Sequence, residues 1–154
     1  MSGLATACVI PPPGDFASGD AGPSAPPVLL SAAPEEFAFP GVMTLDRGDQ
    51  RRLILTLRDV DVDDTLFVRL FVDYGLPNQE NSLSSCTALP TGEQTRVADC
   101  STAQLCEPIT DTAEHYLEAV VADREFLDEG DPPFRALPET GASSARGWIM
   151  QCNP

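Results

Sequence analysis

Four aspartates in one short stretch have the types and spacing of ion ligands. Asp59, Asp61, Asp63 and Asp64 alternate like the opening of an EF-hand calcium loop, in which oxygens at positions 1, 3 and 5 converge on the ion. The rest of that loop is missing, because position 6 is Asp64 instead of glycine and position 12 is Leu70 instead of glutamate. The stretch therefore supplies ligands for only half of a calcium loop.

This stretch, residues 59–64, allows two interpretations. One is a looser calcium site at the end of a β-sandwich, which Asp123 or Glu125 joins across the same end. The other, which we favour, is a solvated turn between two strands, whose charges keep a sheet edge soluble and unpaired. We expect no cofactor, and calcium stays the open alternative.

Candidate catalytic residues are few. His115 is the only histidine, and no Ser, Cys or Asp lies at a recognisable catalytic spacing from it, so we expect a surface residue that begins a strand. Carboxylate pairs such as Asp123 and Glu125 suit glycoside hydrolysis, but 24 acidic residues produce such pairs by composition alone. Trp148 and Tyr116 have the side chains of a sugar-binding platform, although a lone tryptophan in a closing strand is usually core. We predict that the chain is not an enzyme.

Cys8 stands apart from the other cysteines and has a different predicted role. The preceding residues make the sequence Leu-Ala-Thr-Ala-Cys, which resembles the lipobox of bacterial lipoproteins, where a signal peptidase cuts and the new N-terminal cysteine carries lipid. A secretory signal needs a charged start and an apolar run of roughly 7–15 residues, and only residues 1–7 precede Cys8. We therefore expect the true start of the reading frame upstream, with residues 1–8 as the remnant of the signal and Cys8 as the lipidated residue.

The remaining four cysteines predict two disulfides. Cys86, Cys100, Cys106 and Cys152 can pair in three ways, and an even number in a small domain is typical of an oxidising compartment. We favour Cys86–Cys100, which closes a turn-rich loop, together with Cys106–Cys152, which ties down the last strand; the other two pairings stay open. The absence of any Cys-x-x-Cys pair argues against a zinc site.

The charge balance excludes two classes of partner. The net charge is −15, and the nine basic residues are all arginines. Such a surface repels nucleic acid and the anionic faces of membranes. The sequence also has no apolar run of about 18 residues that would form a transmembrane helix. We expect membrane attachment through lipid, for which two acyl signals on one cysteine suffice.

Composition divides the chain into a tether and one domain. Residues 9–27 contain six prolines and three glycines, which is typical of a disordered linker. From residue 28 to 154, short apolar runs alternate with turn residues, and the polar stretch 77–92 is typical of a long surface connection. The predicted strands cover residues 28–31, 41–45, 51–58, 65–74, 95–100, 115–123 and 147–152.

Side-chain alternation in these runs predicts the architecture. Leu53, Leu55 and Leu57 share one face, and the runs at 65–74 and 115–123 repeat the period of two. Aromatic residues on the second face of 65–74 indicate that this face is partly covered too. About seven short strands without an amphipathic helix predict an all-β fold, an antiparallel β-sandwich.

Three segments carry a family resemblance. They are the aspartate-rich run 55–74, the sequence His-Tyr-Leu-Glu-Ala-Val-Val-Ala-Asp-Arg at 115–124, and Trp-x-x-x-Cys at 148–152. Together they resemble uncharacterised lipoproteins of myxobacteria and their relatives, which have immunoglobulin-like sandwiches. The resemblance implies this fold and a cell-envelope location, by analogy at the outer membrane, but no activity.

The sequence as a whole predicts a non-catalytic, lipid-anchored envelope protein. Its β-domain would act as a structural or protein-interaction module, with an unknown envelope protein as partner and the membrane contacted through the anchor. The alternative is a calcium- or carbohydrate-binding adhesion module.

Overall fold

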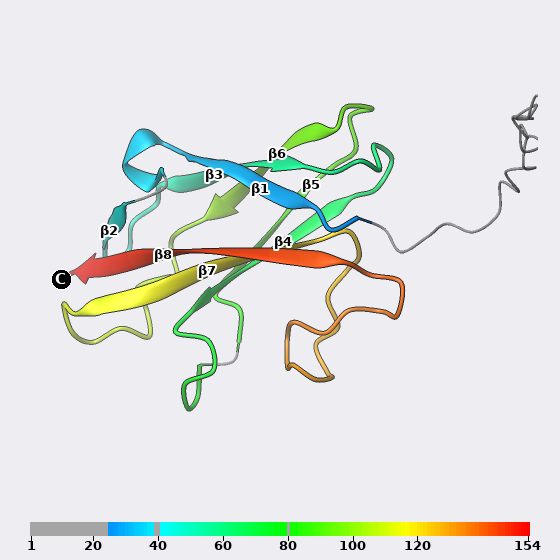
Figure 1. The fold of residues 1–154 in the computed structure, drawn as a ribbon. Helices are drawn as coiled ribbons and strands as arrows, with labels where there is room; N and C mark the ends of the chain where they lie inside the picture. The colour runs from blue at the N-terminus through cyan, green and yellow to red at the C-terminus, as the bar shows by residue number, and fades with distance from the viewer. Residues whose placement is uncertain (1–24, 39–40, 80) are drawn as a thin grey trace, which may run out of the picture.

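A computed structural model describes residues 25–38, 41–79 and 81–154, and the described chain is all-β (Figure 1). Cys8 and the predicted tether up to residue 24 lie outside the described residues. Within those ranges there are eight strands, one short 3-10 turn (η1, Glu35–Phe37) and no α-helix. The strands are β1 (Val28–Ala33), β2 (Val42–Asp46), β3 (Arg52–Arg58), β4 (Leu66–Val72), β5 (Ser84–Ala88), β6 (Thr95–Ser101), β7 (Glu114–Ala122) and β8 (Ser143–Asn153).

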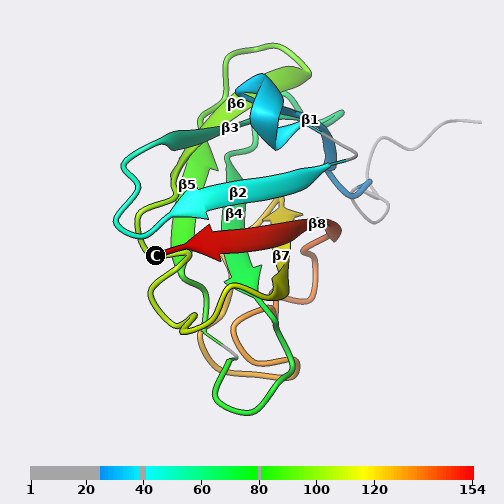
Figure 2. The same cartoon turned by 90° about the vertical axis from the view of Figure 1, so that its left-hand side faces the viewer.

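The strands form two sheets. The smaller has the order β1-β3-β6, and the larger has the order β2-β8-β7-β4-β5. The larger sheet is curled, and Figure 2 shows β2 and β8 side by side and running across the direction of β4 and β7. The predicted central strand 115–123 corresponds to β7, which lies in the middle of the larger sheet.

The main core lies between the sheets and follows the predicted alternation. Leu53, Leu55 and Leu57 of β3 are fully buried, as are Leu66 and Leu70 of β4. Burying an apolar side chain of this size contributes about 1.5–3 kcal/mol, so this regular pattern fixes which face of each strand points inward. Trp148 is also in the core, where its Nε1 donates a hydrogen bond of 2.8 Å to the Phe37 carbonyl of η1.

A second, smaller core covers the outer face of the larger sheet. Phe71 on β4 and Val120 on β7 are buried there under Phe126, which belongs to the long connection between β7 and β8. The prediction that the second face of 65–74 is covered is therefore confirmed. Arg135 lies over the rings of Phe71 and Tyr74, 4.5 Å and 3.6 Å from their centres.

Two details of the predicted fold are wrong. The stretch 77–92 is not only a surface connection, because it contains β5, which pairs with β4. The side chains of Ser84–Ala88 are small and mostly polar, so this strand shows no alternation of apolar and polar residues in the sequence. The sandwich is also not wholly antiparallel, since β2 runs parallel to β8, with Val42 opposite Ile149.

The sandwich has two ends. We call the end at which β1 begins the proximal end, and the end at which β8 finishes at the C-terminus the distal end. At the proximal end β1 begins, β3 and β7 end, and β4, β6 and β8 begin. At the distal end β2 and β8 finish, and β3 and β7 start. In Figure 1 the start of β1 lies on the right and the C-terminus on the left.

Candidate functional site

The predicted calcium stretch 59–64 lies at the proximal end, where it surrounds an arginine. Arg96 on β6 is fully buried, and its Nη2 lies 3.7 Å from Oδ2 of the equally buried Asp59. The guanidinium also donates hydrogen bonds to the carbonyls of Asp61 (2.8 Å) and Asp64. A permanently charged side chain of this chain therefore occupies the inside of the turn and neutralises its carbonyl dipoles.

Burial dominates the electrostatics of Asp59. It raises the pKa of this carboxyl above its usual value, while hydrogen bonds from neighbouring backbone groups and the charge of Arg96 act in the opposite direction. One oxygen, Oδ2, receives no hydrogen bond from any described residue. The pair is therefore a buried ion pair with incomplete hydrogen bonding, the kind in which each partner depends on the other.

Two of the other predicted ligands, Asp64 and Asp123, contact a second arginine, Arg124. Arg124 donates from Nη1 to Asp64 Oδ2 (2.6 Å) and to the carbonyl of Asp123 (2.7 Å). Asp123 is buried and accepts a hydrogen bond of 2.7 Å from the Ala142 amide, while its Oδ2 has no hydrogen-bond partner in the described ranges. Asp123 thus does lie at the same end as the 59–64 stretch, whereas Glu125 lines a groove on the outer face.

These contacts leave the calcium hypothesis without a formed ligand set. The carboxylates of Asp59 and Asp64 pair with different arginines, Arg96 and Arg124. Across the described part of the chain, no group of three His, Cys, Asp or Glu side chains is arranged to hold a metal ion. Calcium binding stays a prediction, and Arg96 and Arg124 are the cations that an ion would have to displace.

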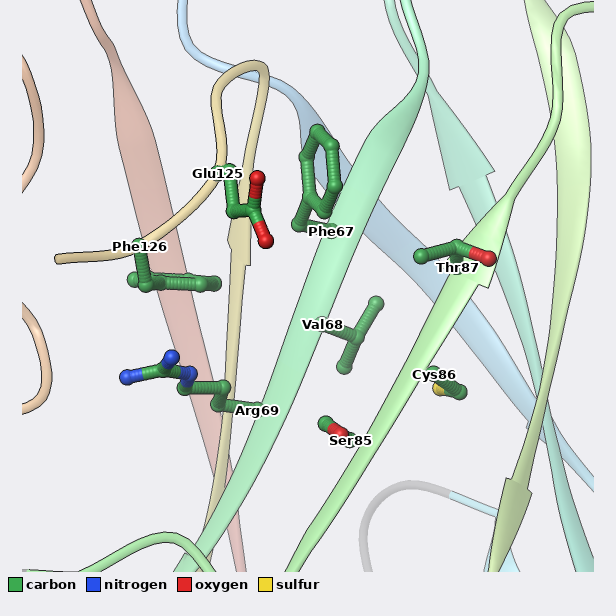
Figure 3. A pocket seen from close by; sticks show the side chains of 8 residues that line it. All are labelled: Phe67, Val68, Arg69, Ser85, Cys86, Thr87, Glu125 and Phe126. Atoms are coloured by element: carbon green, nitrogen blue, oxygen red, sulfur yellow. The ribbon is translucent and has the colours of Figure 1, made fainter. Parts of the chain in front are cut away.

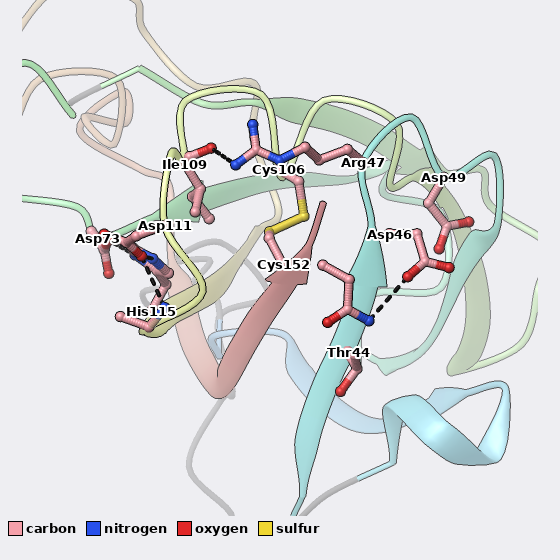
Figure 4. Close-up of a disulfide and its surroundings, with 12 residues drawn as sticks. Thr44, Asp46, Arg47, Asp49, Asp73, Cys106, Ile109, Asp111, His115 and Cys152 are labelled. Carbon is pink, nitrogen blue, oxygen red and sulfur yellow. Dashed lines mark hydrogen bonds and ion pairs between the residues drawn. A yellow bond between two sulfur atoms is a disulfide. The ribbon is translucent and has the colours of Figure 1, made fainter.

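The distal end holds a second charged cluster, centred on His115. The ring lies between two carboxylates, with Nδ1 2.6 Å from Asp73 Oδ2 and Nε2 3.0 Å from Asp111 Oδ1 (Figure 4). Burial lowers the pKa of His115, but the hydrogen bonds with Asp73 and Asp111 outweigh it and raise the pKa above the ordinary value. Two acceptors require two N–H donors, and only the protonated ring has both.

Asp73 makes this cluster part of the sheet. Its backbone has a positive φ of 50°, its amide donates to the Tyr116 carbonyl, and its Oδ1 accepts the Tyr116 amide, both at 2.8 Å. The carboxylate therefore joins the end of β4 to the start of β7 while it holds His115. With both ring nitrogens engaged, His115 acts as a clamp between two loops.

The two disulfides confirm the favoured cysteine pairing. Cys86–Cys100 joins β5 to β6 and so links the two sheets, with 5.1 Å between the Cα atoms. Cys106–Cys152 joins the loop before β7 to the end of β8, with 5.8 Å between the Cα atoms. Figure 4 places this second bond beside the His115 cluster, where Arg47 also holds the loop through the Ile109 carbonyl.

The outer face of the larger sheet has a shallow groove of about 340 Å³ beside its β5 edge. Phe67, Arg69 and Thr87 contribute to its floor, with Glu125 and Phe126 at one side (Figure 3). The Arg69 guanidinium lies 5.1 Å from the centre of the Phe126 ring and is paired with Asp128 at 2.7 Å. The Arg69 charge at the groove is therefore already neutralised within the chain.

A row of exposed apolar side chains crosses the opposite part of this face. Val42, Ile149 and Tyr116 lie in register on β2, β8 and β7, and we call them the apolar row. They are 47%, 39% and 48% exposed. Trp148 does not join Tyr116 in a sugar-binding platform, because the indole points into the core.

Sequence reasoning missed the residues that complete both clusters. Arg96 is buried while its neighbour Val97 is 56% exposed, the reverse of what side-chain polarity suggests. The alternation of side chains along the strand was the signal that could have found it. Cys100 points inward to bond with Cys86, so Ala98 and Arg96, two and four residues before it, lie on the same inward face. Asp73 gave no comparable signal, because its link to His115 depends on the pairing of β4 with β7.

Comparisons with known proteins add no family to this geometry. No family model matches the chain, and no curated protein matches it. Among the described residues, no helix is long and apolar enough to cross a membrane.

Proposed function

We propose that this chain is a lipid-anchored protein of the bacterial cell envelope and that its β-domain is a non-catalytic interaction module. The observation that carries the proposal is the pair of disulfides, Cys86–Cys100 and Cys106–Cys152. Stable structural disulfides form in oxidising compartments and are rare in the bacterial cytosol. They favour export, and the lipobox-like residues before Cys8 supply the means of attachment.

The finer fold that we propose is immunoglobulin-like. The sheet order β1-β3-β6 corresponds to strands A, B and E of that fold, and β8-β7-β4-β5 corresponds to G, F, C and C′. On this correspondence β2 is the second half of strand A, moved across to pair with strand G. The disulfides differ from the antibody arrangement, in which strands B and F are joined.

The proposed attachment gives the two ends different surroundings. A chain anchored at Cys8 reaches β1 at the proximal end, so the point of attachment lies at that end. The distal end and the adjoining apolar row lie away from the point of attachment. A binding role suits this arrangement better than hydrolysis, because both nitrogens of His115 are occupied by carboxylates.

One alternative is favoured by a specific observation. Asp59 Oδ2 and Asp123 Oδ2 are buried at the proximal end without a hydrogen-bond donor from the described residues, and orphaned carboxylate oxygens are what a calcium site would use. A calcium-binding adhesion module is therefore the second candidate, and a calcium titration separates the two.

Intact-mass spectrometry of the protein from its native membrane tests the envelope proposal. We expect a mature chain that begins at Cys8, carries the added mass of acyl groups and gains four hydrogens when both disulfides are reduced. An unmodified chain with free thiols at Cys86, Cys100, Cys106 and Cys152 would refute export and anchoring together.

A further inference from the structure

The apolar row has a geometry that nothing inside the fold explains. Its three side chains point to the outer face of the larger sheet, because the residues next to them, Met43, Met150 and Leu117, point into the core. The register places Ile149 directly opposite both Val42 and Tyr116, so the row is continuous across β2, β8 and β7. Figure 2 shows β2 and β8 adjacent on this side of the molecule.

Tyr116 is held in place by its surroundings. Its ring lies against Gly147 on β8, so closely that a Cβ atom at position 147 would come within 2.2 Å of the phenol oxygen. Its amide and carbonyl are both hydrogen-bonded to Asp73. The ring is therefore positioned before any partner arrives, which reduces the ordering cost of binding.

Several other aromatic rings of the domain lie against an arginine, and Tyr116 does not. Arg51 lies over Phe37, Arg69 over Phe126, and Arg135 over Phe71, at 4.5–5.1 Å from the ring centres. No arginine of the described chain lies over Tyr116. An exposed tyrosine ring attracts an arginine or lysine side chain, because the electron density of its face is negative.

The surrounding charge is also acidic. Glu114 and Glu118 flank Tyr116 on the same side of β7; Glu118 pairs with Arg135, while Glu114 forms no ion pair with any residue that the structure describes. Nearly all arginines already contact a carboxylate or carbonyl within the chain, as Arg47 and Arg146 do with backbone carbonyls. With a net charge of −15, this surface complements a basic partner and repels a second copy.

Strand edges are poor alternatives as docking sites. The edge strand β1 is capped by Arg146, which donates to the Leu29 carbonyl, and by Ser144, which donates to the Pro27 carbonyl. On β2, Arg51 donates to the Thr44 carbonyl at 2.9 Å. Cys86–Cys100 ties β5 to β6. Side chains that occupy edge carbonyls hinder the addition of a further strand, so we favour a sheet face as the recognition surface.

We propose that the apolar row binds a basic and apolar segment of a partner protein, which places an arginine or lysine side chain over Tyr116 beside Glu114. Apolar side chains of the same segment then pack on Ile149 and Val42. This inference rests on the proposed interaction function and adds the chemistry of the partner.

The test is a nuclear magnetic resonance titration of the full ¹⁵N-labelled chain with three capped five-residue peptides. The first alternates arginine and leucine, the second alternates glutamate and leucine, and the third alternates arginine and glycine. We expect the first peptide to shift amide signals in β2, the second half of β8 and the start of β7. The second peptide should cause no shifts, and the third should bind more weakly because it lacks apolar side chains. Shifts spread evenly over the acidic surface would overturn the proposal.

Three variants sharpen the outcome. Tyr116→Ala should weaken binding of the arginine-leucine peptide about five-fold or more, while Tyr116→Phe, which keeps the ring, should bind as the wild type does. Gly147→Ala keeps Tyr116 but displaces its ring, so it should also weaken binding. Val97→Ala removes an exposed apolar side chain from the smaller sheet and is the matched control. Unchanged affinity in both Tyr116→Ala and Gly147→Ala would refute the proposed site.

This result is independent of the test of the anchor. Lipid on Cys8 together with peptide binding that ignores Tyr116 would refute the binding face alone. Peptide binding at the apolar row, together with a native protein whose mass shows no lipid on Cys8, would refute the anchor alone.

Discussion

The proximal and distal ends of the sandwich each hold a cation among aspartates, but the two cations behave differently. At the proximal end the cation is the guanidinium of Arg96, which is fully buried; guanidinium groups stay protonated in proteins. At the distal end it is His115, whose side chain is 15% exposed and whose charge depends on pH. The charge at the proximal end therefore stays constant, whereas the charge at the distal end responds to pH.

The comparison extends to what each cluster holds together. Arg96 fixes a single turn by binding its carbonyls from within the core. His115 joins two separate loops through Asp73 and Asp111, and Asp73 also positions the backbone of Tyr116. The proximal cluster therefore supports the fold, while the distal cluster supports the surface that we propose for binding.

The largest expected effect comes from removing the proximal cation. Arg96→Met leaves Asp59 buried without its partner, and we expect a loss of about 3–5 kcal/mol in the free energy of unfolding. Urea denaturation followed by tryptophan fluorescence measures this loss. Arg58→Met, on the exposed face of β3, is the control and should change stability by less than about 0.5 kcal/mol. A similar, small loss in both variants would contradict the role of Arg96 as the buried partner that the proximal turn needs.

A smaller effect is expected at the distal end, and only below a certain pH. The fold raises the pKa of His115, so its contribution to stability is complete below the unfolded value of about 6.5 and disappears as the pH rises through the folded value. His115→Gln should therefore cost about 1–2 kcal/mol at acidic pH and much less at alkaline pH. Urea denaturation of both proteins across the pH range gives the difference curve. A difference that is the same at every pH would contradict the titrating role.

The smallest expected effect is that of calcium on the wild-type protein. Arg96 and Arg124 already pair with the carboxylates of Asp59 and Asp64, so adding calcium after chelation should leave the thermal midpoint unchanged. In Arg96→Ser the guanidinium is gone, and calcium should stabilise this variant more than the wild type. A rise of several degrees in the wild type would favour the calcium-binding alternative and show that the proximal end is not closed by arginine.

The sequence predicted those parts of the fold in which alternation and burial agree. The alternation of Leu53, Leu55 and Leu57 predicts β3. The even number of cysteines predicts two disulfides, and their favoured pairing is confirmed. Strand β5 was missed because small side chains in Ser84–Ala88 carry no amphipathic signal; its place is decided by pairing with β4 and by Cys86. The parallel pairing of β2 with β8 also depends on how the chain crosses between sheets, which local pattern does not encode.

The candidate sites were less predictable than the fold. The aspartates at 59–64 were found by spacing, but their partner Arg96 lies on a distant strand and points inward against its polarity. His115 was expected to be an ordinary surface residue, whereas the structure places it between Asp73 and Asp111. Contacts between residues far apart in sequence follow from strand register, and a single sequence specifies that register only through the completed core.

The measurement that most directly tests the contrast between the ends is the folded-state pKa of His115, obtained from the ring signals of the full protein in a nuclear magnetic resonance pH titration. The account predicts a value above the ordinary 6.5 of histidine, because two carboxylates stabilise the protonated ring. A value at or below 6.5 would show that burial outweighs Asp73 and Asp111, and would contradict the account of the distal end as the part of the fold that responds to pH.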